Sequence, residues 1–196
     1  SAAIAARQGT SDGDVVGLSF FTHDSSTGSD DAVEKVRIHD GGAVSFNNGI
    51  ILGNSLNYGT SNLLDDYETG TWVPSLNSGS HTAYSTQWYV KVGQLVTCYF
   101  YMYAFSDSSS NTQIKIGGLP FPRQAHRESF FHIPCTNTSG FGSGLSGVVG
   151  RIGVYGSTTE IALFLENLNG STGELKYNSG NVNNTHFACT FSYYAD

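Results

Sequence analysis

The sequence predicts an all-β protein with an antiparallel β-sandwich or jelly-roll-like head, preceded by a short β-rich segment. Gly, Ser, Thr and Asn supply 80 of the 196 residues, so residues that favour turns are abundant. Only 13% of the residues are charged, whereas helical bundles are rich in Ala, Leu, Glu, Lys and Arg. The eleven Tyr and twelve Phe residues argue against a disordered chain. An all-β fold is the class that remains.

The leading segment contains short strands and sharp turns. Residues 17–23 form one candidate strand, and residues 34–39 form a second in which charged and apolar side chains alternate. An Asp-Gly turn at Asp40 leads into residues 43–46, and such a turn between alternating runs is a strong hairpin signal. The apolar residues are too few to form a core, so we expect this segment to need partners that bury its apolar face.

Charge and composition both change near residue 66. Residues 1–66 carry nine acidic and three basic residues, whereas residues 67–196 carry seven and six. Residues 62–68 are consistent with one short helical turn that has Asn62 as its N-cap. We therefore predict a shaft or neck segment at residues 1–66 and a β-sandwich head at residues 67–196.

The head follows the two-residue period of β-strands. Residues 87–91 and 95–105 flank a Val-Gly-Gln turn and predict a hairpin. In the second strand one face is expected to be core and carries Val96, Cys98, Phe100, Met102 and Ala104. The other face carries Leu95, Thr97, Tyr99, Tyr101, Tyr103 and Phe105. Further strands are predicted at 112–116, 129–133, 147–155, 160–165 and 186–194.

Charge, hydropathy and cysteine spacing exclude several classes of partner. The formal charge is −7 and no cluster of Lys or Arg occurs, so nucleic acid is not an expected partner. The longest apolar run, residues 98–105, is far shorter than the ~18 residues that a membrane span needs. The three cysteines lie far apart without zinc-ligand spacing, and we expect no metal and no cofactor.

Catalytic patterns are weak throughout the chain. The adjacent acidic pairs, at residues 30–31 and 65–66, lie in a loop and in a turn, where solvent exposure or capping explains them. The other carboxylates show no spacing that predicts the paired acids of a glycosidase. No Gly-x-Ser-x-Gly elbow occurs, and the six histidines are isolated. We expect no catalysis, and hydrolysis of an envelope polysaccharide remains an alternative.

Binding residues are expected on strands and loops of the head. Aromatic side chains are candidates for stacking against sugar rings, although core or subunit-interface roles explain them as well. A basic loop at residues 123–128 is a candidate for anionic polysaccharide, with a solvated loop or an ion pair between subunits as the alternative. A third candidate is the Gly/Ser-rich loop at residues 136–146. The candidate residues are Trp88, Tyr99, Tyr101, Tyr103, Arg123, Arg127 and Phe141.

Four landmarks of the head occur in the same order as in a known family. Residues 63–74 read LLDDYETGTWVP, which resembles the LDDYEEGTWTP signature of bacteriophage tail-fibre and other phage structural proteins. Residues 89–96 match the YxKxGxLV hairpin of that family, residues 118–121 match its GLPF element, and residues 192–195 match its SYxA-like tail. The leading segment at 34–46, EKVRIHDGGAVSF, resembles the shaft repeat ERMRIDSSGNVGIG but departs from it at the turn.

The resemblance implies the distal region of a homotrimeric fibre, a shaft followed by a β-rich head. Such a region would lie in the virion tail together with other tail or baseplate proteins. Its head would bind a receptor on the bacterial surface, with polysaccharide as the expected class, and a trimer would bury the apolar residues of the leading segment. A purely structural virion fibre, decoration protein or baseplate element without receptor contact is the alternative.

Overall fold

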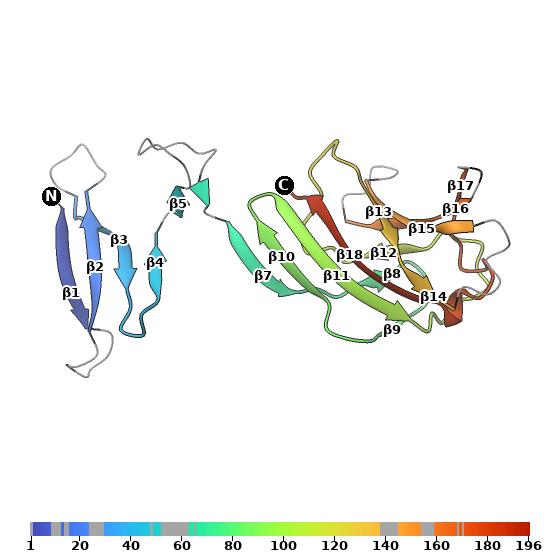
Figure 1. Cartoon of the computed structure of the whole chain (residues 1–196), viewed down its shortest axis with the longest axis horizontal. Coiled ribbons are helices and arrows are strands. Elements are labelled where there is room, and N and C mark those ends of the chain that lie inside the picture. The colour runs from blue at the N-terminus through green and yellow to red at the C-terminus, as the bar shows by residue number, and fades with distance from the viewer. Residues whose placement is uncertain are drawn as a thin grey trace. The chain divides into compact units, whose positions relative to one another are not determined.

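The chain forms two compact units of antiparallel strands in the computed structural model (Figure 1). The structure describes residues 2–8, 13, 16–23, 30–47, 49–51, 63–64, 66–137, 145–153, 159–167, 169 and 171–196. The units are Ser1–Asp66 and Tyr67–Asp196, called here the leading unit and the head. Because strands dominate both units and the head is a sandwich of two sheets, the predicted all-β sandwich-like fold is confirmed. No helix among the described residues has the length and apolar character to cross a membrane.

The leading unit is built on one four-stranded sheet, the leading sheet. Its strands lie in chain order: β1 (Ala3–Gln8), β2 (Val16–Thr22), β3 (Val33–Ile38) and β4 (Val44–Phe46). The predicted hairpin connects β3 to β4, and its turn is closed by the His39 N–H, which donates to the Ala43 carbonyl at 2.8 Å. Gly42 adopts a φ of 84° in this turn, a conformation that glycine reaches without steric cost.

The helical turn predicted at residues 62–68 is wrong. Strand β6 (Leu63–Leu64) pairs with β5 (Ile50–Ile51), and Tyr67–Thr71 forms strand β7 of the head. Asn62 itself lies outside the described residues. Pairing with neighbouring strands satisfies the backbone of these residues, and this long-range interaction outweighs the local capping signal.

The head consists of two sheets. The first, called the β11 sheet, contains β14 (Cys135–Thr136), β18 (His186–Tyr194), β11 (Leu95–Tyr103), β10 (Trp88–Val92) and β7 in that order, and β9 (Thr82–Ala83) also pairs with β11. The second, called the β16 sheet, contains β13 (Ser129–Ile133), β15 (Leu145–Ile152), β16 (Ile161–Asn167), β12 (Lys115–Gly117) and β8 (Ser75–Leu76), with β17 (Thr172–Glu174) paired to β16. A short 3-10 helix, η3 (Val182–Asn184), precedes β18.

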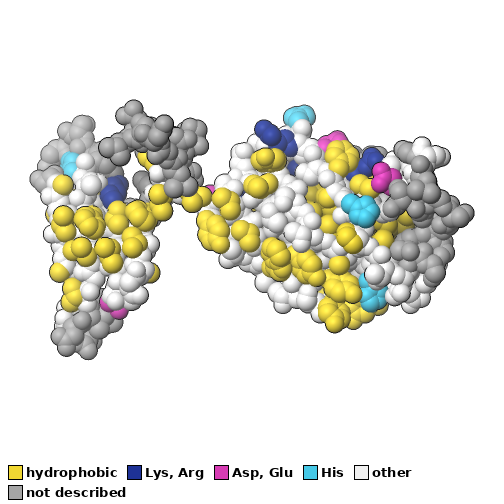
Figure 2. All heavy atoms as spheres, in the orientation of Figure 1, with side chains coloured by type: hydrophobic (Ala, Val, Ile, Leu, Met, Phe, Trp, Pro, Cys, Tyr) yellow, Lys and Arg dark blue, Asp and Glu magenta, His cyan; other side chains and the backbone are white. Residues whose placement is uncertain are grey.

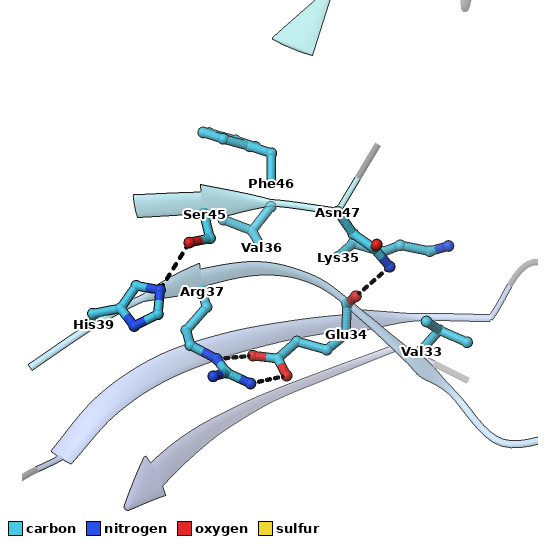
Figure 3. A pocket seen from close by; sticks show the side chains of 9 residues that line it. All are labelled: Val33, Glu34, Lys35, Val36, Arg37, His39, Ser45, Phe46 and Asn47. Carbon is cyan, nitrogen blue, oxygen red and sulfur yellow. Dashed lines mark hydrogen bonds and ion pairs between the residues drawn. The ribbon is translucent and has the colours of Figure 1, made fainter. Parts of the chain in front are cut away.

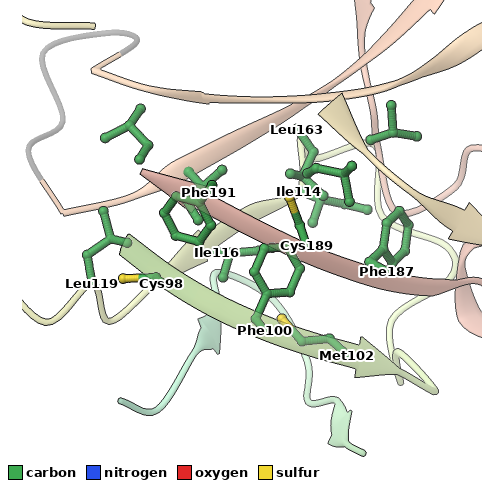
Figure 4. Close-up of a cluster of buried hydrophobic side chains, with 14 of the residues drawn as sticks. Cys98, Phe100, Met102, Ile114, Ile116, Leu119, Leu163, Phe187, Cys189 and Phe191 are labelled. Atoms are coloured by element: carbon green, nitrogen blue, oxygen red, sulfur yellow. The ribbon is translucent and has the colours of Figure 1, made fainter. Parts of the chain in front are cut away.

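The inner faces of the two sheets close over one apolar core (Figure 4). On β11 the predicted inward residues Val96, Cys98, Phe100 and Met102 are all inaccessible to solvent. Across the gap between the sheets, Phe131 of β13 stacks on Phe191 of β18 with ring centroids 4.5 Å apart. Contacts of this kind show that the sheets are packed face to face, as in other β-sandwiches.

The side-chain orientations predicted for Ala104 and Phe105, at the end of the strand expected at 95–105, are wrong. The strand stops at Tyr103, and Ala104 adopts a φ of 53°, which breaks the alternation. Ala104 is therefore exposed rather than buried. Phe105, expected on the outer face, turns inward and packs on Phe187 with ring centroids 5.3 Å apart.

Candidate functional site

The outer face of the β11 sheet carries no Lys, Arg, Asp or Glu over the described strands β7, β10, β11 and β18. This face follows from the strand register, because the residues on either side of each buried position point away from the core. Its residues are Tyr67, Thr69, Thr71, Trp88, Val90, Val92, Leu95, Thr97, Tyr99, Tyr101, Tyr103, His186, Ala188, Thr190, Ser192 and Tyr194. Tyrosine, tryptophan and hydroxyl side chains thus dominate a surface that faces solvent.

Four rings gather at one end of this outer face and are called here the tyrosine cluster. They are Tyr84, which follows β9, Tyr101 and Tyr103 of β11, and His186 of β18. Tyr84 lies 4.8 Å from Tyr101 between ring centroids, and Tyr103 stacks on His186 at 4.9 Å with an interplanar angle of 22°. The Tyr101 hydroxyl and His186 Nδ1 form a hydrogen bond of 2.8 Å. Stacking and hydrogen bonding therefore fix the positions of the rings.

A second aromatic pair continues the row along β10 and β11. Trp88 and Tyr99 stack with centroids 5.8 Å apart and an interplanar angle of 15°. Behind them the buried Trp72 indole donates to the Tyr99 carbonyl at 3.0 Å, which ties the pair to the core. Four of the five aromatic candidates from the sequence thus lie on one surface, because Tyr99, Tyr101 and Tyr103 alternate on the same strand beside Trp88.

The rest of the tyrosine cluster was missed by sequence analysis. Tyr84 lies in an irregular segment between β9 and β10, so no period assigns it to a face. His186 begins a predicted strand, but its partner is revealed only by the register in which Met102 lies opposite Phe187. Cross-strand neighbours of this kind carry no local sequence signal.

The basic loop does not present the surface that its sequence predicts. Arg123 is 5% exposed, and its Nη1 donates to the Gln124 carbonyl at 2.7 Å. Its guanidinium is packed so closely against Gly153 that a Cβ there would lie 2.8 Å from Nε. Arg127 is exposed, and its guanidinium lies over the Tyr194 ring at 4.9 Å. Of the two arginines, Arg127 alone remains a surface candidate; Phe141 lies outside the described residues.

The sequence landmarks of the head meet in space and have structural roles. The Tyr89 hydroxyl donates to Glu68 Oε1 at 2.5 Å, and this hydrogen bond raises the pKa of Tyr89. Gly70 leaves room for that ring, because a Cβ at Gly70 would lie 2.7 Å from the Tyr89 hydroxyl oxygen. Phe121 packs edge-on against Tyr89 at 5.3 Å and receives a 2.9 Å hydrogen bond at its carbonyl from the Tyr193 hydroxyl. The four landmarks are therefore parts of one packing arrangement.

The leading unit holds an open pocket of about 420 Å³ on β3 and β4 (Figure 3). Its carboxylate, Glu34, accepts hydrogen bonds from Arg37 at 2.5 Å, from Ser19 at 2.7 Å and from Arg7 at 2.9 Å. The hydrogen bonds from Arg37 and Ser19 lower the pKa of Glu34 to about 2. Because this carboxylate already accepts hydrogen bonds from three protein donors, it is not a free group for a ligand.

Two of the three cysteines, Cys98 and Cys189, are buried in the head. Burial raises the pKa of the Cys98 thiol to about 12 and that of Cys189 to about 11, so both are neutral thiols near pH 7. Among the described residues, no three His, Cys, Asp or Glu side chains come close enough to bind a metal ion together.

The surface with the most distinctive chemistry is thus the outer face of the β11 sheet, seen from one side in Figure 2 as the apolar side chains along the head. Aromatic rings and hydroxyl groups can bind a ligand by stacking and hydrogen bonding without charge. The sequence of this chain matches no protein-family model and no curated protein.

Proposed function

We propose that the chain is the distal region of a bacteriophage tail fibre, a homotrimer that attaches the virion to a receptor on the bacterial surface without catalysis. Polysaccharide is the receptor class. The observation that carries this proposal is the row of solvent-facing aromatic rings on the outer face of the β11 sheet, where the described strands β7, β10, β11 and β18 contribute no charged side chain. The four sequence landmarks of the head supply the link to phage fibres, and we propose that other tail or baseplate proteins adjoin the chain.

The tyrosine cluster suits a neutral sugar. A pyranose ring presents C–H groups on its faces and hydroxyl groups around its rim. Tyr84, whose side chain is exposed, can pack against the C–H face, while the Tyr101 hydroxyl and His186 can exchange hydrogen bonds with sugar hydroxyls. Because stacking and the bond between Tyr101 and His186 already order these rings, binding costs less conformational entropy.

A homotrimer makes this mode of binding effective. One sugar on one aromatic cluster is a weak contact, whereas three heads on one fibre bind a repeating polysaccharide together. The second and third contacts are then intramolecular, and avidity exceeds the affinity of a single head.

The proposal is tested by binding of the full chain to bacterial cells and to purified envelope polysaccharide. Tyr84→Ala and Trp88→Ala should each weaken binding at least about tenfold, because truncating an aromatic anchor at a binding hot spot costs ~2 kcal/mol or more. Phe130→Ala is the matched control, since Phe130 is an exposed ring on the outer face of the other sheet. A chain that binds no strain of a broad panel and does not block phage adsorption would refute receptor binding, and release of oligosaccharides would refute the absence of catalysis.

A second candidate function is favoured by the lack of charged residues in the described strands of the same face. Depletion of charged residues together with enrichment in Tyr and Trp also marks the centres of protein–protein interfaces. The face would then join heads to each other or to another virion protein in a purely structural fibre. In that case Trp88→Ala would change the mass of the assembly, while cells and polysaccharide would show no binding to the unmodified chain.

A further inference from the structure

The leading sheet has one continuous apolar face. The strand register aligns its side chains in two rows across all four strands. The first row is Ile4, Phe20, Val36 and Phe46, and the second is Ala6, Leu18, Ile38 and Val44. Figure 2 shows these rows as bands of apolar side chains across the leading unit. Strands that alternate in this way form a sheet with one apolar face, and that face must be buried against another layer.

The opposite face of the leading sheet carries Ala3, Ala5 and Phe21 together with polar side chains that bond to one another. Ser19, Arg37 and Ser45 lie side by side across its strands. Glu34 accepts from Ser19 and from Arg37, and Arg7 of β1 reaches the same carboxylate at 2.9 Å. This face can therefore remain in water, and the apolar face is the one that requires a partner.

Nothing among the described residues of the leading unit buries the apolar face. No apolar residue in that part of the unit is buried, and Ile4 and Val44 are 68% and 49% exposed. A unit of this size normally needs a disulfide, a metal or association to be stable. Residues 1–66 contain no cysteine, and the described residues of the unit provide no metal site. For the part of the unit that the structure describes, association is the stabilising device that remains.

We propose that the apolar face of the leading sheet is closed by the same face of other copies of this chain. This inference specifies the self-association surface of the homotrimer proposed above and is independent of receptor binding. The two rows carry no charge, so identical copies meet without burying an unpaired ion. Side chains of this number and exposure leave on the order of 600 Å² of apolar surface per copy, close to the ~800 Å² per partner of a standard interface.

The test uses two neighbouring residues of one strand. Ala5 and Ala6 are both exposed residues of β1, but Ala6 belongs to the apolar face and Ala5 to the opposite face. Ala6→Lys and Ala5→Lys add the same side chain and the same charge to opposite faces. The mass of the full chain is measured by analytical ultracentrifugation over a range of concentrations.

We expect the unmodified chain to have three times its monomer mass of 21.0 kDa. Ala6→Lys should raise the concentration at which the assembly dissociates at least about tenfold, as a charge in an apolar interface is left without a partner. Ala5→Lys should leave that concentration unchanged. Ala6→Leu adds apolar surface at the same position and should lower it, which separates an interface effect from misfolding.

Three results would overturn the inference. One is a monomeric unmodified chain, as expected if the head of the same chain covers the apolar face. Another is an equal effect of Ala5→Lys and Ala6→Lys on dissociation. The third is an assembly weakened by Ala6→Leu as much as by Ala6→Lys. A monomer that binds bacteria would refute this inference but not the proposed receptor binding. An assembly that binds no cells would refute the proposed receptor binding but not this inference.

Discussion

The leading unit and the head use the same strand pattern with opposite outcomes. In β11 of the head, every second residue from Val96 to Met102 is inaccessible to solvent, because the β16 sheet covers that face. In β3 of the leading unit, Val36 and Ile38 alternate in the same way, yet both remain accessible among the described residues. Alternation thus determines which side chains share a face, and a second layer determines whether that face becomes a core.

The exposed faces of the two units also differ in chemistry. The apolar face of the leading sheet consists of Ala, Val, Leu, Ile and Phe, none of which has a polar group that could face water. The outer face of the β11 sheet carries Tyr, Trp, Thr and Ser, whose hydroxyl and indole groups interact with water as well as with a ligand. This contrast is why we assign self-association to the first face and receptor binding to the second.

Truncation of a core ring should reveal the largest difference between the units. Phe100→Ala removes an inaccessible ring that packs on Trp72 and Phe191, and should lower the free energy of unfolding of the head by about 3–5 kcal/mol. Both tryptophans lie in the head, so their fluorescence during urea denaturation reports this loss. The control Phe130→Ala, at a ring that is 57% exposed, should cost less than about 1 kcal/mol. Equal costs would contradict the assignment of the core.

A smaller effect is expected where the sequence landmarks pack together. Gly70→Ala places a methyl group 2.7 Å from the Tyr89 hydroxyl oxygen, so the ring or strand β7 must shift, at a cost of about 1–3 kcal/mol. Gly173→Ala is the matched change, because Gly173 also lies in a strand and a Cβ there meets no atom within 4 Å. Its effect should stay within about 0.5 kcal/mol. If thermal denaturation gave the two variants the same midpoint, the packing role of Gly70 would be wrong.

The smallest effect concerns pH and distinguishes the leading unit from the head. Hydrogen bonds from Arg37 and Ser19 lower the pKa of Glu34 from its usual 4.5 to about 2. The stabilisation is therefore complete above pH 4.5 and is lost as the pH falls through 2. Hydrogen exchange of β2 and β3, corrected for its intrinsic pH dependence, should increase over this range.

Glu34→Gln is the control for the pH experiment. It removes the titrating group from the network, so exchange of β2 and β3 should no longer vary between pH 4.5 and 2 through this carboxyl group. Unchanged acid sensitivity in the variant would show that another group is responsible. Hydrogen bonds from Ser78, Ser109 and Ser110 also lower the pKa of Asp107 in the head. The acid sensitivity of hydrogen exchange around Asp107 can therefore be compared with that of β2 and β3 in the same sample.

Much of the secondary structure was predictable because strand signals are local. The β18 strand has the predicted bounds, and the Gly-Gln turn between β10 and β11 forms the expected hairpin with Gly93 at a φ of 57°. The predictions for Ala104 and Phe105 were wrong because one residue with a positive φ ends the alternation. A backbone conformation of that kind at a residue other than Gly has no clear sequence signal.

The candidate site was predictable in part for the same reason. Tyr99, Tyr101 and Tyr103 share a face because they alternate on one strand, which the sequence shows directly. His186 joins them through strand pairing and Tyr84 through ring packing on Tyr101, whereas Arg123 is excluded from the surface by packing beside Gly153. Both effects depend on residues far away along the chain.

The amino-acid sequence by itself determined the all-β class, most strand positions, the hairpins and the side chains that share each strand face, because these depend on neighbours within a few residues. The tertiary structure alone decided which faces are covered, which aromatic rings meet, and that the landmarks of the head form one packing arrangement. Burial requires a second layer, and no local pattern states whether the chain supplies that layer itself. The head supplies its own, whereas the described leading sheet leaves its apolar face exposed.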